Sequence, residues 1–128
     1  MKRGLSVAIW LFLACATSLG QPTIDFDSDN AITSYCHIYI THLDAHQAGE
    51  NLPGNPTAFL FADTICLGSI SSVVNLSEAD HITGPPPNVT HTQIIKAVVQ
   101  YIDGQPARSH EMFAILAREA LQAAWPCR

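Results

Sequence analysis

The fold is decided by the stretch Val89-Thr90-His91-Thr92-Gln93-Ile94-Ile95, which carries a full set of helix-start signals. Thr90 and Gln93 have the spacing of a capping box, in which each side chain accepts a hydrogen bond from the backbone N–H of the other residue. Val89 and Ile94 flank this pair and can form a hydrophobic staple. The sequence therefore predicts a helix that begins directly after Thr90.

Two helices follow from this start. Gly104 and Pro106 end the first, and Ser109 is expected to cap the second, which Pro126 ends one residue before Cys127. Apolar residues recur three and four apart along both, as the buried stripe of a helix requires. The residues expected to face inward are Ile94, Ile95, Val98, Val99 and Ile102, then Phe113, Leu116, Ala117, Ala120, Leu121 and Ala124.

Two more helices are predicted upstream of the deciding stretch. One begins at Ser28 or Asp29 and ends near Ala48-Gly49, and the other is capped by Thr57 after the turn-rich residues 51–56. We therefore predict an all-α fold, a small bundle of four to five helices. The apolar positions are Ile32, Tyr35, Cys36, Tyr39, Ile40 and Leu43, then Phe59, Leu60, Ile65, Cys66, Ile70 and Val73.

The residues before the bundle have the layout of a secretory signal peptide. Lys2 and Arg3 precede a mostly apolar run that is too short to cross a bilayer, and small residues follow it. We predict a leader over residues 1–20 and a single mature domain over residues 21–128, periplasmic or secreted. Lipidation at Cys15 is the less favoured alternative. We expect no later segment to cross a membrane.

The charge of the mature chain disfavours nucleic acid and anionic membranes as partners. The chain has 6 Lys and Arg against 11 Asp and Glu, so loss of Lys2 and Arg3 leaves four basic and eleven acidic side chains, a net charge of −7. The four basic residues form no patch along the sequence. This balance allows a basic protein partner, or serves only to keep the domain in solution.

Three cysteines remain in the mature chain. If the first two helices form an antiparallel hairpin, Cys36 and Cys66 lie level with each other, 13 residues before residue 49 and 10 residues after residue 56. We predict that they form a disulfide, which would stabilise the fold by about 3 to 4 kcal/mol. Cys127 would then have no partner.

Several segments occur in an order that resembles a known family. They are Cys66-Leu67-Gly68-Ser69-Ile70-Ser71-Ser72-Val73, Gly84-Pro85-Pro86-Pro87-Asn88-Val89-Thr90, Gln105-Pro106 and Ala124-Trp125-Pro126-Cys127. They look like the Cys-x-Gly-Tyr-Ile-x-Gly-Val, Cys-x-Pro-x-Gly-Val-Thr, His-Pro and Phe-Pro-Cys segments of the Rap/Tai-type immunity proteins, which are associated with type VI secreted amidases of Gram-negative bacteria. The resemblance covers roughly residues 28 to 127.

Three of the departures from the family pattern lie in the two cysteine-led segments and matter most. Ser69 replaces a tyrosine, Ser72 replaces a glycine, and Gly84 replaces the third cysteine. If the third and fourth family cysteines pair, the change at Gly84 leaves Cys127 as a lone thiol. The competing prediction is that Cys127 pairs with Cys36 or Cys66.

Neither the histidines nor the possible nucleophiles predict a metal site or a catalytic site. His42 and His46 share a face of the first helix, but the sequence offers no third metal ligand and no adjacent glutamate, so we interpret them as solvent-facing. The remaining histidines are isolated. No nucleophile elbow or phosphate-binding glycine loop occurs. We predict no enzyme, no cofactor and no metal.

The resemblance implies a periplasmic immunity protein that binds and inhibits a secreted toxin, by family association a type VI peptidoglycan amidase. An inhibitor of this kind needs a protruding loop, and residues 75–88 are the best candidate because three prolines stiffen them. Glu78, Asp80 and His81 are the predicted partner-binding residues. Residues 50–55 offer a second candidate surface, and a homodimer is plausible by resemblance.

The alternative is a small periplasmic helical protein with a housekeeping role. It would buffer metal or redox equivalents through its 6 histidines and Cys127. Titration with zinc distinguishes this buffering role from toxin inhibition, because tight zinc binding would favour buffering.

Overall fold

The computed structural model describes residues 29–127, and the predicted leader and residues 21–28 lie outside them. The described chain folds into four α-helices and one short 3₁₀ helix, without a named strand, which confirms the predicted all-α class. The helices are α1 (Asp29–Gln47), α2 (Pro56–Ala79), α3 (His91–Asp103), η1 (Pro106–Arg108) and α4 (Phe113–Ala124).

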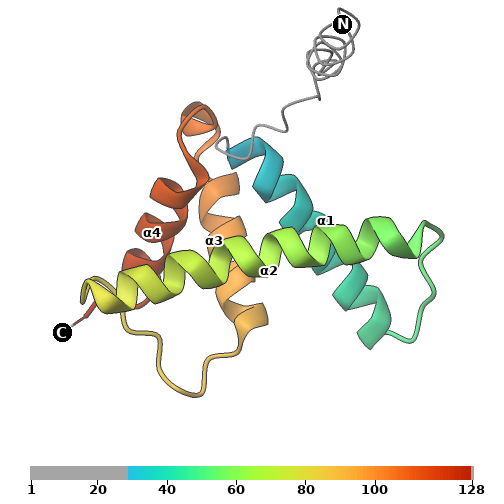
Figure 1. Cartoon of the computed structure of the whole chain (residues 1–128), viewed down its shortest axis with the longest axis horizontal. Coiled ribbons are helices and arrows are strands. Elements are labelled where there is room, and N and C mark those ends of the chain that lie inside the picture. Colours follow the sequence, from blue (N-terminus) through green and yellow to red (C-terminus); the bar gives the residue numbers. More distant parts are fainter. Residues whose placement is uncertain (1–28, 128) are drawn as a thin grey trace, which may run out of the picture.

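The long helix α2 organises the bundle. Figure 1 shows it running across the other helices, with α1 returning from it as a hairpin at one end and α4 beneath its other end. The most extensive packing is between α1 and α2 and between α3 and α4, and α2 also contacts α4 and α3. The two hairpins are thus packed on each other with the core between them.

The predicted stripes of α3 and α4 form much of the core, whereas the stripe predicted for α2 is confirmed only in part, because Leu60 is 67% exposed. In α2, Ala62, Cys66, Ile70, Val73 and Ser77 are buried at spacings of three and four. Every inward position predicted for α3 is buried, as are five of the six predicted for α4. Ala124 is the exception, because it lies exposed in the last turn of α4.

The predicted disulfide is confirmed. Cys36 and Cys66 are fully buried and bonded to each other, with their Cα atoms 4.9 Å apart. The hairpin that places them together is closed by Gly49, whose φ of 74° belongs to the left-handed region that favours glycine. The N–H groups of Gly49 and Glu50 donate to the carbonyl oxygens of His46 and Ala45, which is a Schellman motif.

Of the three helix caps that the sequence predicts, one is confirmed and two are wrong. The capping box of α3 is confirmed, since the N–H of Thr90 donates to Gln93 Oε1 at 2.8 Å and the N–H of Gln93 donates to Thr90 Oγ1 at 3.3 Å. The cap predicted at Thr57 is wrong. Asn55 caps α2 by accepting a hydrogen bond from the N–H of Thr57 at 2.9 Å, and Pro56 occupies the first helical position, where its missing N–H costs nothing.

The cap predicted at Ser109 is also wrong. Residues 106–108 form η1 instead, and α4 begins at Phe113 after Met112, which makes no side-chain cap. The boundary of the predicted loop shifts as well. Helix α2 continues to Ala79, because the burial of Ser77 extends its inward stripe, so Glu78 is helical and the connection to α3 comprises residues 80–90.

The prediction that no segment after the leader could cross a membrane is wrong by length and composition. Helix α2 has 24 residues, and an 18-residue window of it has a mean hydropathy of 1.6. Aliphatic and aromatic residues, with alanines among them, produce this value although several serines interrupt the run. In the folded domain, α2 uses one stripe of these residues for the core and for the disulfide.

Candidate functional site

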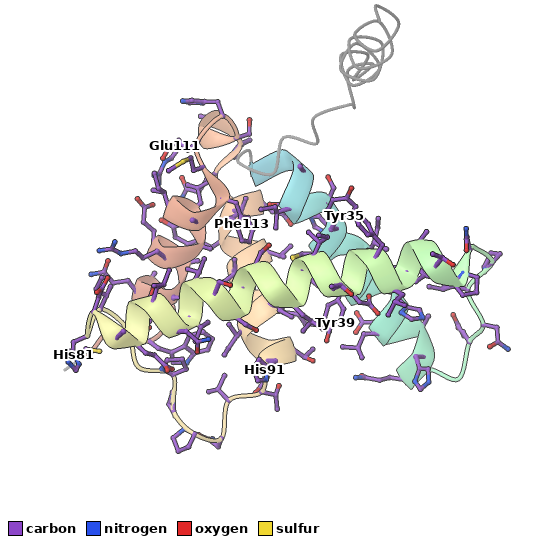
Figure 2. All side chains as sticks on the ribbon, in the orientation of Figure 1. Tyr35, Tyr39, His81, His91, Glu111 and Phe113 are labelled. Carbon is purple, nitrogen blue, oxygen red and sulfur yellow. A yellow bond between two sulfur atoms is a disulfide. The ribbon has the colours of Figure 1, made fainter. Side chains whose placement is uncertain are left out.

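The three predicted partner-binding residues lie together at the C-terminal end of α2. We call Glu78, Asp80 and His81 the α2 tip. All three are exposed, and Asp80 is the C-cap, whose N–H donates to the carbonyl of Leu76 at 3.0 Å. Figure 2 shows His81 at this end of the helix, directed away from the bundle. The structure therefore brings these residues onto one accessible corner.

The backbone at the α2 tip adopts an uncommon conformation. His81 has a φ of 55° and is the only residue other than glycine with a positive φ between residues 29 and 127. A side chain in the left-handed region costs conformational energy, and such residues concentrate at functional positions. The turn reverses the chain at once, so His81 stands at the corner and does not continue the helix.

The carboxylates of the α2 tip lie where the dipole of their own helix disfavours negative charge. The C-terminal end of a helix carries a partial negative charge, which disfavours acidic side chains there. The last turn of α2 holds no basic residue, and within the described chain neither Glu78 nor Asp80 forms an ion pair. Two negative charges are thus available for a partner.

Two other glutamates near a chain reversal, Glu111 and Glu119, are paired. The Arg108 guanidinium donates to both carboxylate oxygens of Glu111, at 2.6 and 2.7 Å, and to both of Glu119, at 2.6 and 3.0 Å. These bonds hold the pKa of Glu111 and of Glu119 below the ordinary value, and they raise the pKa of Arg108. Tyr101 also donates to Glu119, at 3.2 Å, so this network ties α4 to η1 and α3.

The residues after the α2 tip are anchored by Thr83, which the sequence did not single out. Its side chain is 1% exposed, and its hydroxyl lies 2.7 Å from the carbonyl oxygen of Trp125 and 3.1 Å from that of Leu121. The N–H of Gly84 also donates to the Trp125 carbonyl, at 3.1 Å, and Thr83 forms a β-bridge with Pro126. These contacts give the Trp125 carbonyl its donors and add a second donor to the Leu121 carbonyl, which also accepts the N–H of Trp125 at 2.8 Å.

The rest of the connection is stiff without being buried. Pro86, Pro87 and Asn88 are exposed, and the N–H of Val89 closes a turn on the carbonyl of Pro86 at 2.9 Å. Val89 packs against the core directly before the capping box of α3. The exposed prolines are therefore fixed at both ends, which limits the conformational entropy that binding would cost.

Cys127 lies beside the position where the family pattern has a third cysteine. It is exposed and not bonded to another cysteine, so the competing prediction of a bond to Cys36 or Cys66 is wrong. A β-carbon built on Gly84 would lie 3.6 Å from the Cys127 sulfur. The pairing implied by the resemblance is therefore geometrically compatible with this chain, which lacks only the second thiol.

The second candidate surface, residues 50–55, borders a pocket of about 300 Å³ between the ends of α1 and α2. His42 and His46 line it, and His42 stacks on Phe59 with ring centroids 4.8 Å apart. His42 is therefore not simply solvent-facing, because an aromatic ring covers one of its faces. Its Nδ1 atom lies 3.6 Å from an Asp63 oxygen.

The metal-buffering alternative finds no ligand set in the structure. Within residues 29–127, no three His, Cys, Asp or Glu side chains are grouped so that they could hold a metal ion. His37, predicted to be isolated, instead lies 3.0 Å from an oxygen of Asp103 and links α1 to the end of α3. The histidines placed so far thus contact neighbouring helices or solvent.

Comparison with known proteins agrees with the extent of the fold. The family model of the Rap1a immunity proteins matches residues 29–127, which is the whole of the described domain. No curated protein and no solved structure gives a significant match to the chain.

Proposed function

This chain belongs to the Rap1a immunity protein family, and we propose that it binds and occludes a secreted peptidoglycan amidase of the type VI pathway. Family membership supports a role against a secreted toxin. The amidase is the finer part of the proposal, and it rests on the resemblance of the segments around Cys66, Gly84 and Cys127. We propose binding without catalysis and without a cofactor.

The observation that carries the proposal is the unpaired charge of the α2 tip. Glu78 and Asp80 lie exposed at the negative end of a 24-residue helix without an ion pair in the described chain, while Glu111 and Glu119 are both paired with Arg108. Charges left unpaired in the free protein attract a partner of opposite charge and orient it as it approaches. The α2 tip therefore fits a basic rim around the cleft of an enzyme.

The shape of the same corner supports occlusion. His81 projects at the reversal of the chain, and the prolines after it lead into a turn that the N–H of Val89 closes on the carbonyl of Pro86. An inhibitory segment that is already ordered loses little entropy on binding. We propose that this corner enters the cleft of the toxin and excludes its substrate.

The compartment and the oligomeric state belong to the proposal as well. A disulfide in so small a domain fits an oxidising compartment, and we propose that the protein acts in the periplasm after removal of residues 1–20. Lipidation at Cys15 remains the less favoured form. A homodimer is proposed by resemblance, and light scattering of the purified mature chain tests it.

The binding proposal is tested by calorimetric titration of the mature chain with the candidate amidase encoded nearest its gene. The double variant Glu78→Gln with Asp80→Asn should bind about tenfold more weakly, and its affinity should depend less on salt. Glu50→Gln is the comparison variant: Glu50 is also exposed but belongs to the second candidate surface at the other end of α2, so a larger loss of affinity in this variant would assign binding to that surface instead. Failure of the unaltered chain to bind the amidase would overturn the proposal.

A further inference from the structure

We propose that the toxin is held by a second feature beside the α2 tip, an apolar groove between α2 and α4 that receives one of its hydrophobic side chains. We call this feature the α2–α4 groove and define it by Leu76 and Asp80 of α2 and Ile115 and Arg118 of α4. The inference rests on the proposed function and adds to it the surface and the chemistry by which the partner is recognised.

The α2–α4 groove exposes apolar side chains that the fold does not use. Its volume is about 240 Å³, and Leu76 is 67% exposed and Ile115 is 41% exposed. Below them, the groove is closed by Val73 and Ser77, which are buried in the core. A large aliphatic side chain that stays in water beside a concave floor is typical of a position that a partner covers.

The groove is continuous with the α2 tip. Asp80 belongs to both, and Leu76 lies one helical turn before it, with its carbonyl accepting the N–H of Asp80. A protein that contacts Asp80 therefore also reaches the edge of the groove. This continuity is why we assign the groove to the toxin and not to a second copy of this chain.

The charges at the edge of the groove define what the partner presents. Asp80 and Arg118 line the same groove, yet no ion pair joins them or engages either one within residues 29–127. Two opposite charges beside an apolar floor form the polar rim of a protein interface. The matching partner carries an aliphatic or aromatic side chain between a basic group, facing Asp80, and an acidic group, facing Arg118.

The chain offers a matched control for this proposal. Leu60 lies on the same helix and is exposed to the same fraction as Leu76, 67%, but it lines the pocket at the other end of α2, beside His42 and Glu50. Substitution of Leu60 or Leu76 by aspartate makes the same chemical change at equal exposure. The two variants differ in which end of α2 receives it.

The experiment measures the affinity of Leu76→Asp, Ile115→Asp and Leu60→Asp for the candidate amidase, with the thermal unfolding of each variant as a check of folding. We expect Leu76→Asp and Ile115→Asp to weaken binding by about 30-fold or more, as for a central interface residue, and Leu60→Asp to weaken it by less than about threefold. Arg118→Glu should weaken binding through the charged rim, and it leaves the apolar floor in place should either aspartate variant fail to fold.

The remaining outcomes would each contradict a different part of the proposal. If Leu76→Asp binds as the unaltered chain does, or if Leu60→Asp is the more damaging change, the groove is not the docking surface. If Leu76→Asp abolishes self-association but not amidase binding, the groove is an interface between two copies, and the inference is wrong. If the unaltered chain does not bind the amidase, the proposed function fails and this inference fails with it.

Discussion

Replacing Gly84 by cysteine should create a second disulfide, with Cys127, and stabilise the domain. A β-carbon at position 84 would lie 3.6 Å from the Cys127 sulfur. A disulfide holds these two atoms about 3 Å apart, because the S–S bond is ~2.05 Å long. The missing few tenths of an ångström are available because Cys127 is exposed and next to the last residue. Gly84 has no positive φ, since Gly49 is the only glycine between residues 29 and 127 that does, so a side chain introduces no backbone strain.

The size of the effect follows from the loop that the new bond closes. Positions 84 and 127 are 43 residues apart, and closing such a loop lowers the entropy of the unfolded chain enough to stabilise the fold by about 4 kcal/mol. Some of this gain is lost to adjustment of the terminal residues, so we expect about 2 to 4 kcal/mol. For a domain of this length, that corresponds to a rise in Tm of about 10 °C or more.

The assay combines a thiol count with thermal unfolding of the chain without residues 1–20. The unaltered protein should show one reactive thiol, from Cys127, and Gly84→Cys should show none and remain monomeric on a non-reducing gel. Gly84→Ser is the matched control because it adds a side chain of similar size without sulfur. Two reactive thiols in Gly84→Cys, or a Tm equal to that of Gly84→Ser, would refute the geometry on which the prediction rests.

Four further predictions test the remaining features. Replacing Cys36 and Cys66 by alanine should destabilise the domain by about 3 to 4 kcal/mol in urea unfolding, because a 30-residue separation is no longer cross-linked; an unchanged midpoint would contradict this. Thr83→Val should cost about 0.5 to 1.5 kcal/mol in the same assay, because it removes the hydrogen bonds of the hydroxyl while the carbonyls of Trp125 and Leu121 keep their backbone donors; a midpoint equal to that of the unaltered chain would count against this. Arg108→Ala should lower the Tm at neutral pH and flatten its dependence on pH. The paired glutamates have pKa values below the ordinary 4.5, so they stabilise the fold above that pH and lose this contribution as the pH falls through their folded-state values; identical Tm profiles from pH 6 to 3 would contradict the pairing. Glu78→Lys should raise the stability of the free protein by about 0.3 to 1 kcal/mol while weakening toxin binding, and a loss of stability would show that Glu78 has a structural partner.

The features that the sequence predicted correctly depend on residues close in the chain. Thr90 and Gln93 form the capping box because both groups belong to one turn of α3, where no distant residue competes for them. The disulfide between Cys36 and Cys66 was predictable for a similar reason. A short connector makes α1 and α2 antiparallel, and their spacing from it then sets which residues meet.

The features that the sequence did not reveal depend on residues far apart in the chain. Thr83 binds carbonyls 38 and 42 residues later, and nothing in its local sequence distinguishes it from an exposed threonine. Arg108 binds Glu119 across 11 residues, and the structure it holds replaces the helix start that Ser109 suggested. Of these contacts, only the spacing of Arg108 and Glu111, three residues apart, could have been noticed in advance.

The segment around the α2 tip likewise combines a feature that the sequence predicted with one that depends on distant packing. The run from Gly84 to Pro87 correctly indicated an extended segment, but it could not reveal where α2 ends. That boundary depends on the burial of Ser77, which is decided by packing in the core. Consequently, Glu78 belongs to the last turn of a helix and has a fixed position, which a loop residue would lack.

Stabilising contacts elsewhere in the domain explain how it tolerates two acidic side chains at the negative end of α2. Arg108 pairs with both Glu111 and Glu119, the disulfide fixes the middle of α2 to α1, and Thr83 anchors the chain directly after α2 to the end of α4. This stability leaves room for Glu78 and Asp80 to face the negative end of their own helix at a cost of a fraction of a kcal/mol to about 1 kcal/mol each. The cost is recovered only when a basic partner arrives, since the same charges then interact favourably across the interface. The stability of the free protein alone favours lysine at such a position, so the presence of two acids there is better explained by binding.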